Sequence, residues 1–225
     1  EKPNHLFSMV LLCQNDTGYK NLTRLVSKAY LEGQHEGTPL IHRQWITEHA
    51  EGLIALSGAK FGDIGQALAS NDEQKAISHA QNWSEIFPGR FYIEIQRTGR
   101  EGETAYNAQV VKLAEKLALP LVATNDVRFI NEEDFDAHEA RVCIHDGYTL
   151  ADPRRKKCYS SQQYLRSAEA MQTLFSDLPQ AIANTVEIGK RCSVKLELGK
   201  NYLPNFPVPN GASVETYLSQ LSHEG

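Results

Sequence analysis

The sequence predicts an α/β protein with a mainly parallel sheet and crossover helices. Short apolar runs typical of strands alternate along its 225 residues with longer segments whose apolar residues fall at helical spacing. This β-then-α order favours parallel strands, because two consecutive parallel strands need a long crossover connection, usually a helix. The length suits one large domain or two small ones. The apolar spacing does not distinguish an open sheet from a closed barrel.

The predicted elements follow one another in order. Residues 5–13, 52–58, 90–96 and 121–126 are short, largely apolar runs, so all four are expected to be strands. After the first run, the segment NDTGYKNLTRLVSKAYLEG predicts a turn and a helix that ends at Gly33. Further helices are expected at residues 63–68, 72–87, 101–119, 133–144, 168–175 and 179–192.

A change in composition near residue 200 predicts a domain boundary. The stretch KLELGKNYLPNFPVPNG carries Pro204, Pro207 and Pro209, which is typical of an extended tether. We therefore expect one domain over residues 1–200, then a proline-rich linker and the start of a further helix over residues 201–225. The chain begins without a methionine and ends within helix-like sequence, which we interpret as a fragment of a longer protein.

Composition narrows the classes of function. The net charge is −5 and the pI about 5.9, whereas surfaces that hold duplex nucleic acid are usually basic. No apolar run approaches the roughly 20 residues that span a bilayer, and the N-terminal run lacks a signal-peptide cleavage site. We expect a cytoplasmic protein without membrane contact.

The four cysteines are widely spaced, so buried or incidental thiols are expected rather than disulfides or a zinc site.

Small or polar residues end three of the predicted strands, in LSGAKFG, EIQRTGR and ATNDVRF. Ligands of parallel α/β folds gather at the carboxyl ends of strands, so a site is expected there. Each segment taken alone also has a structural interpretation. These are a tight turn at Ser57 and Gly58, an exposed strand face at Glu94, Gln96 and Thr98, and a helix cap at Asn125 and Asp126.

Other candidate groups favour structural roles. Asp126 and Arg128 lie two residues apart, so on an extended chain they would share one side and form an ion pair. His138 and His145 fall in one predicted helix, without carboxylates at a known metal-ligand spacing. The basic run at residues 154–157 is expected to be a solvated loop rather than a phosphate contact, given the acidic balance of the chain. The GxGxxG and Walker patterns of nucleotide-binding loops are absent, and so are the GxSxG and HExxH patterns.

Five motifs, in order, resemble the PHP (polymerase and histidinol phosphatase) domain of bacterial DNA polymerase III alpha subunits of gammaproteobacterial type. They are NDTGYKNLTRLVSKAY, GLIALSG, FYIEIQRTG, LPLVATNDVRFINEEDFDAHEARVCI and NTVEIGKRCSV. The resemblance covers nearly the whole chain, and LPNFPVP with the following helix resembles the exit toward the polymerase palm. It implies a distorted (β/α)7 barrel, incomplete here at its N-terminus because the family's opening segment precedes residue 1.

The resemblance also implies a degenerate metal site. PHP domains that keep their activity use histidines, carboxylates and a cysteine to hold divalent metals for phosphoester hydrolysis. The cysteine position is Ala59 here, two histidine positions are Thr98 and Arg128, and only the carboxylate of Asp126 is kept. Alanine and arginine offer no lone pair, and a hydroxyl is a weak ligand. These four positions are therefore expected to be vestigial, with no bound metal and no catalytic residue, and with Arg128 replacing the metal charge.

The leading hypothesis is a non-catalytic part of a replicative DNA polymerase. It would support the palm and dock the proofreading exonuclease subunit, and would reach DNA through the remainder of the alpha subunit. The Mg²⁺-dependent polymerase carboxylates would lie beyond residue 225. Whether this segment is itself an enzyme stays open at this point. The alternatives are a zinc- or manganese-dependent phosphoesterase or 3′–5′ exonuclease, and an independent regulatory binding module.

Overall fold

The computed structural model of the chain describes residues 6–201, 203 and 206–225. These residues form two compact units, Glu1–Val194 and Lys195–Gly225. The domain boundary expected at residue 200 stays a prediction, and Pro204 lies outside the described residues. In the second unit, η3 (Pro209–Gly211) precedes helix α9 (Val214–Glu224), and the ring of Phe206 stacks on that of Tyr217.

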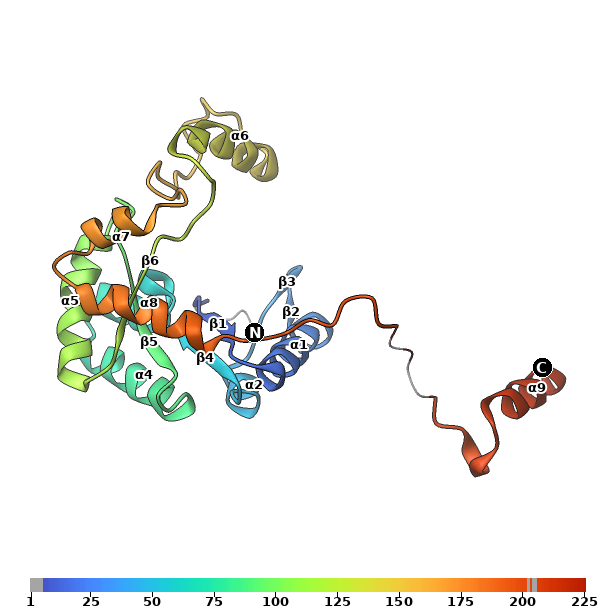
Figure 1. Cartoon of the computed structure of the whole chain (residues 1–225). Coiled ribbons are helices and arrows are strands. Elements are labelled where there is room, and N and C mark those ends of the chain that lie inside the picture. Colours follow the sequence, from blue (N-terminus) through green and yellow to red (C-terminus); the bar gives the residue numbers. More distant parts are fainter. Residues whose placement is uncertain (1–5, 202, 204–205) are drawn as a thin grey trace. The chain divides into compact units, whose positions relative to one another are not determined.

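The first unit is built on a four-stranded sheet with the order β1-β4-β5-β6 (Figure 1). Its strands are β1 (Val10–Cys13), β4 (Leu53–Leu56), β5 (Phe91–Gln96) and β6 (Leu121–Thr124). Strands β4, β5 and β6 are parallel, whereas β1 is antiparallel to β4. The predicted α/β class and parallel arrangement are therefore confirmed. The described strands form an open sheet and do not close into the expected barrel.

Helices follow the strands as the sequence predicts, with boundaries within two residues of those expected. They are α1 (Asp16–Leu31), α3 (Asp63–Ala69), α4 (Glu73–Ile86), α5 (Glu103–Leu117), α6 (Phe135–Asp146), α7 (Ala168–Leu174) and α8 (Pro179–Arg191). The sequence reasoning missed a small hairpin, β2 (Gln34–His35) and β3 (Thr38–Pro39), and the short helix α2 (Arg43–Glu48). It also missed two single turns, η1 (Ala59–Phe61) and η2 (Glu132–Asp134).

The alternation of side chains along the strands creates two buried layers. Leu53 and Ala55 of β4 point into the larger core, together with residues of α1, α3, α4 and α5. Ile54 and Leu56 point to the other face, where Ile188 of α8 covers them. All side chains of β4 and β5 are buried, because both faces of these strands are covered.

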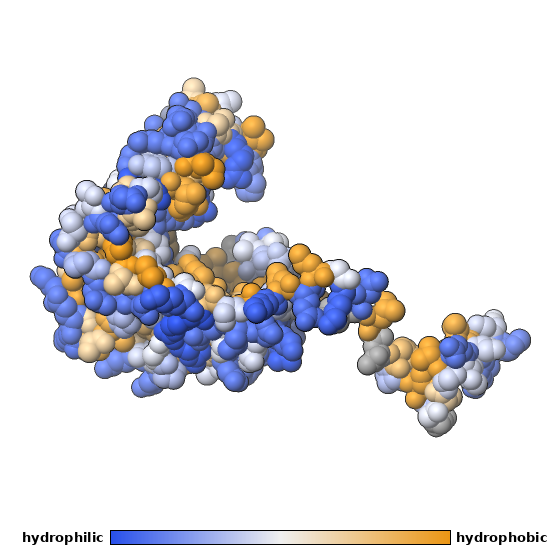
Figure 2. All heavy atoms as spheres, in the orientation of Figure 1, coloured by the Kyte–Doolittle hydropathy of each residue, from blue (hydrophilic) through white to orange (hydrophobic). Residues whose placement is uncertain are grey.

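Figure 2 shows mostly polar side chains on the visible face of the first unit. This is expected for helices that turn their apolar side chains toward the core and their polar side chains toward solvent. No described helix has both the length and the apolar character needed to span a bilayer. The four cysteines are free.

Two glycines let α1 start directly against the turn before β4. A Cβ atom added to Gly18 would lie 1.9 Å from the carbonyl oxygen of Gly52. That oxygen also accepts a hydrogen bond of 2.8 Å from the amide of Gln14, and Asn15 caps the helix by accepting from the amide of Gly18. Gly52 itself has a φ of +71°. The close approach of the two backbones is therefore possible only without a side chain at position 18.

We expect Gly18→Ala to lower the free energy of unfolding by about 1–3 kcal/mol or more, because one backbone must move to admit the methyl group. Gly189→Ala in α8 is the matched control, since no atom lies within 4 Å of its added Cβ. That control should raise stability by roughly 0.5–1 kcal/mol. Urea unfolding followed by circular dichroism measures both variants. Equal stabilities would show that the two backbones do not approach this closely.

Candidate functional site

Polar side chains converge where the parallel strands end, as the sequence predicts. Glu94 and Gln96 of β5 are buried, and so is Thr98 in the turn that follows. An exposed strand face is therefore the wrong interpretation of these three residues. Ser57, after β4, is buried as well, and its hydroxyl accepts a hydrogen bond of 3.0 Å from the amide of Glu94. Buried polar groups need partners, so the contacts among them define what this region can do.

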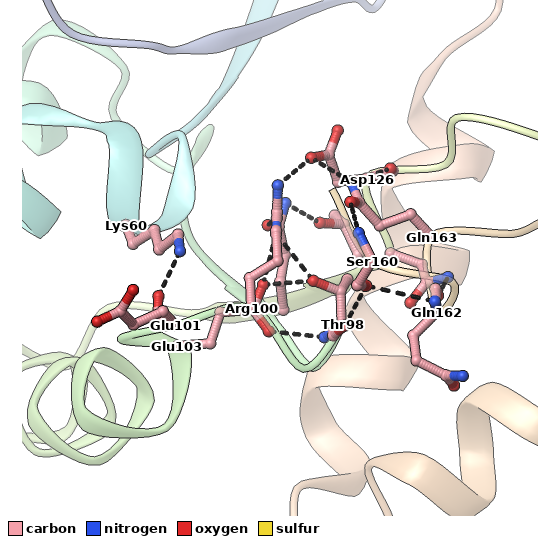
Figure 3. Close-up of polar contacts among 12 residues, drawn as sticks. Lys60, Thr98, Arg100, Glu101, Glu103, Asp126, Ser160, Gln162 and Gln163 are labelled. Atoms are coloured by element: carbon pink, nitrogen blue, oxygen red, sulfur yellow. Dashed lines mark hydrogen bonds and ion pairs between the residues drawn. The ribbon is translucent and has the colours of Figure 1, made fainter. Parts of the chain in front are cut away.

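The guanidinium of Arg100 lies among Thr98, Glu103 and Asp126 (Figure 3). Its Nη1 donates to Asp126 Oδ2 at 2.7 Å and its Nη2 donates to Gln96 Oε1 at 2.6 Å. Its Nε lies 2.9 Å from Thr98 Oγ1 and 3.0 Å from Glu103 Oε1. Only 6% of the Arg100 side chain is exposed. All three nitrogens of a buried cation are thus bonded to oxygen, two of them to carboxylates.

Asp126 and Arg128 form the predicted ion pair, with Nη2 and Oδ1 2.8 Å apart. The side chain of Arg128 is 44% exposed, however, so it lies at the rim of the site. The buried partner of Asp126 is Arg100, which the sequence reasoning did not single out. The available signal was the turn Thr98-Gly99-Arg100 followed by Glu103 at the start of α5, a short arrangement that brings opposite charges together.

Asp126 accepts hydrogen bonds from a third donor besides the two arginines. Gln163, which is fully buried, donates from Nε2 to Asp126 Oδ2 at 2.9 Å and to its carbonyl oxygen at 3.1 Å. The backbone of Asp126 has a φ of +41°, in the left-handed region that non-glycine residues rarely adopt. The surrounding bonds hold this carboxylate in place at the cost of local backbone strain.

The other two of the four predicted metal-site positions, Ala59 and Thr98, offer no free ligand atom. Ala59 is buried in η1, directly after β4, and its methyl side chain has no donor atom. The hydroxyl of Thr98 donates to Glu103 Oε1 at 2.5 Å and accepts from Arg100, so it is already engaged. Within the described part of the chain, no group of three or more His, Cys, Asp or Glu side chains is arranged to hold a metal ion. The residues present do not fit the metal cluster of active PHP domains.

Two buried carboxyl groups of the site differ in their pKa. Burial raises the pKa of Glu94, and hydrogen bonds from Thr124 (2.5 Å) and Gln96 (3.0 Å) only partly oppose it. Burial also acts to raise the pKa of Glu103, but hydrogen bonds from Thr98 and the guanidinium of Arg100 outweigh it and lower that pKa. Glu103 is therefore the counterion of Arg100, whereas burial makes the ionised form of Glu94 less favourable than in an exposed carboxyl group.

The segment between α6 and α7 completes the site. Besides Gln163, Ser160 bonds from its hydroxyl to the carbonyl oxygen of Thr98. Asn125 donates to the carbonyl oxygens of Gln162 (2.9 Å) and Tyr164 (2.8 Å), and Phe129 pairs with Tyr164 in a parallel bridge. Sequence reasoning could not find these contacts, because they join residues more than thirty positions apart.

His138, His145 and two arginines of the basic run contact other side chains of the protein. His138 is buried against the rings of Phe129 and Tyr159, with centroids 5.4 and 4.7 Å away, and burial lowers its pKa. His145 is exposed and bonds to the neighbouring Asp146. In the basic run, Lys156 and Lys157 are exposed as expected, whereas the side chain of Arg155 is 9% exposed and pairs with Glu139, so the solvated-loop interpretation is wrong for Arg155. Arg154 is exposed and bonds to Asp152 at 2.7 Å.

Comparison with known proteins confirms the resemblance drawn from the motifs. Residues 2–98 match the family described as PHP domain. The whole chain is 53% identical to DNA polymerase III subunit alpha of Pseudomonas aeruginosa, covering 19% of that protein. It is 50% identical over 99% of its length to the same subunit of Escherichia coli K12 and of Vibrio cholerae, again covering 19% of each. The chain thus spans about a fifth of the length of the curated relatives it matches.

These similarities agree with the order of the five motifs and with the α/β architecture. The match to the PHP domain covers the segment from the N-terminal region through β5 to Thr98. The similarity to the polymerase subunits extends beyond it, through the rest of both compact units. The chain is therefore related over its whole length to one segment of bacterial DNA polymerase III alpha subunits, with residues 2–98 matching the PHP domain.

Proposed function

We propose that this chain is the PHP portion of a replicative polymerase alpha subunit and acts as a non-catalytic scaffold. It would support the polymerase palm and dock the proofreading exonuclease subunit, as the family resemblance implies. In the longer protein the open sheet would form part of a (β/α)7 barrel. The single observation that supports a non-catalytic role best is the buried guanidinium of Arg100, bonded to both Asp126 and Glu103.

The chemistry of the residues at the strand ends supports this proposal. Phosphoester hydrolysis in active PHP domains needs metals that generate hydroxide and stabilise charge in the transition state. A divalent cation placed on Asp126 would face the fixed positive charges of Arg100 and Arg128, whose nitrogens lie 2.7 and 2.8 Å from its oxygens. Like charges at such distances repel by several kcal/mol at the effective dielectric of a protein.

The proposed partners follow from the relatives and from the charge of the chain. The relatives are named as alpha subunits of DNA polymerase III, so DNA synthesis, with its Mg²⁺, would belong to the rest of the subunit. The net charge of −5 supports contact with a protein partner over direct holding of duplex DNA. A cytoplasmic location goes with this role.

The number of metal ions bound per chain tests the proposal that the site is not catalytic. After incubation with Zn²⁺ and Mn²⁺ and extensive dialysis, we expect plasma emission spectroscopy to find far less than one ion per chain, because arginine occupies the site. Hydrolysis of a chromogenic phosphate ester with added Mn²⁺ should equal that of the Asp126→Ala variant. About two tightly bound ions per chain, or activity that Asp126→Ala abolishes, would revive the phosphoesterase alternative.

Titration calorimetry tests the scaffold role. We expect purified proofreading exonuclease subunit to bind the 225-residue chain saturably, and to bind equally well with and without EDTA, since no metal on this chain takes part. Heat-denatured chain serves as the control for non-specific heat. Absence of binding at micromolar concentration would contradict the docking role, whereas binding lost with EDTA would point to a metal-dependent contact.

The pH dependence of stability tests whether Glu94 has a structural role. Its raised pKa means that its contribution to stability is complete below the usual value of 4.5 and is lost as the pH rises through the pKa in the folded state. Glu94→Gln stays neutral and keeps an oxygen for Thr124 and Gln96. We therefore expect the free energy of unfolding of wild type to fall relative to Glu94→Gln between pH 5 and pH 8.

Denaturant unfolding at both pH values gives this difference. Glu133→Gln, at an exposed position, is the matched control and should track wild type. A constant gap between wild type and Glu94→Gln across the range would mean that Glu94 is ionised throughout, contrary to its surroundings.

A further inference from the structure

We infer that a pocket formed by the segment before β1 and by α2, α3 and α4 binds a small organic acid, a carboxylate attached to an apolar body. The pocket has a volume of about 460 Å³, which lies within the range of ligand sites in proteins. Its lining shares no residue with Arg100 and the side chains bonded to it. This binding site therefore does not depend on the proposed scaffold role.

Apolar side chains form much of the pocket wall. They come from the segment before β1, from the turn before α2, and from α2 and α4, and they include Leu6, Met9, Leu40, Ile41, Ile46 and Trp83. Leu6 and Ile41 are exposed, so the wall is open to solvent. An apolar molecule that covers this wall gains free energy from the surface that it removes from water. The body of the ligand is therefore apolar.

The one carboxylate of the described lining, Asp63 at the start of α3, is already engaged. Its Oδ2 accepts from Arg43 Nη2 at 2.6 Å and from Trp83 Nε1 at 2.8 Å. Its Oδ1 accepts from the amide of Ile64 at 2.8 Å. Only 8% of the side chain is exposed. Asp63 therefore holds its neighbours in place and does not serve as the receptor for a ligand cation.

The cation of this ion pair is the member that reaches solvent. The side chain of Arg43, which begins α2, is 38% exposed. Only its Nη2 forms a hydrogen bond to the described residues, so Nη1 and Nε keep N–H donors for a ligand. Asp63 holds one end of the guanidinium, whose carbon lies 4.1 Å from the centre of the Trp83 ring. A guanidinium fixed on two sides is well suited to bind a carboxylate, which accepts two N–H bonds from one fork.

His79 leaves the sign of this exposed charge unchanged. Its Nδ1 lies 3.5 Å from Asp63 Oδ2, but burial outweighs the attraction of Asp63 and lowers the pKa of the imidazole below the usual 6.5. His79 is therefore mostly neutral at pH 7. Besides Asp63 and Arg43, the described lining contains no aspartate, glutamate, lysine or arginine. One guanidinium with two unpaired nitrogens suits a singly charged carboxylate better than a phosphate, which needs more donors.

Quenching of the fluorescence of Trp83 tests this site. The chain of 225 residues has two tryptophans, so Trp45→Phe leaves Trp83 as the reporter. We expect ω-bromooctanoate to quench its emission saturably, because a bromine atom bound in the pocket lies close to the ring. Octanoate should compete with this probe. Octanamide has the same apolar body without the charge and should compete about tenfold more weakly or worse.

Arg43→Gln tests the contact assigned to the carboxylate. The variant keeps an amide donor for Asp63 but removes the charge, so the affinity for octanoate should fall about tenfold or more while the affinity for octanamide stays unchanged. Arg24→Gln is the matched control, because Arg24 is exposed on α1 and bonds to Asn21, outside the pocket. This control should bind both probes as wild type does in titration calorimetry.

Three results would overturn the assignment. Equal competition by octanoate and octanamide would show that the pocket does not recognise the charge. Quenching that fails to saturate at millimolar concentration would indicate non-specific contact, and undiminished octanoate binding by Arg43→Gln would remove Arg43 from the site. If Arg43→Gln does not fold, the comparison of octanoate with octanamide on wild type decides alone. None of these results alters the metal content or the exonuclease binding that test the proposed function.

Discussion

A buried guanidinium must have an acceptor for every donor, and the site at the strand ends is organised by this requirement. An unpaired charge in the protein interior costs far more than most single interactions contribute, so the neighbours of Arg100 cannot vary freely. Gln96, Thr98, Glu103 and Asp126 each supply an oxygen. Their own remaining atoms are in turn bonded to Glu94, Thr124 and Gln163. One charge therefore fixes the end of β5, the start of α5 and the turn after β6 relative to each other.

Under the proposed function, the ends of the parallel strands hold a guanidinium in place of metal ions. Metals bring open coordination positions where water and substrate can react. A guanidinium has donors only, and here those donors are bonded to protein oxygens. The opposite pKa changes of Glu94 and Glu103 agree with an architectural use. Glu103 is the counterion of Arg100, whereas burial raises the pKa of Glu94.

Sequence reasoning predicted those features that depend on neighbours in the chain. The spacing of apolar residues placed four of the described strands and seven of the described helices of the first unit, and the spacing of Asp126 and Arg128 predicted their ion pair. It failed where contacts between segments far apart in the sequence determine the structure. The antiparallel pairing of β1, the burial of Glu94 and Gln96 on a central strand, and the contact of Gln163 with Asp126 all depend on elements far away in sequence. The contact of Arg100 with Asp126 was missed for this reason, although the nearby Glu103 was a local signal for an ion pair. The short helix α2 and the β2–β3 hairpin carry too few residues for a clear periodic pattern.

The bond between Gln163 and Asp126 has a consequence for the order in which the molecule matures on the ribosome. The two residues are 37 positions apart, and Arg100 precedes both. A nascent chain therefore exposes the arginine and Glu103 first, acquires the second carboxylate with residue 126, and receives the amide that steadies it only after α6 has emerged. The full set of hydrogen bonds around Asp126 can therefore form only after residue 163 has been synthesised.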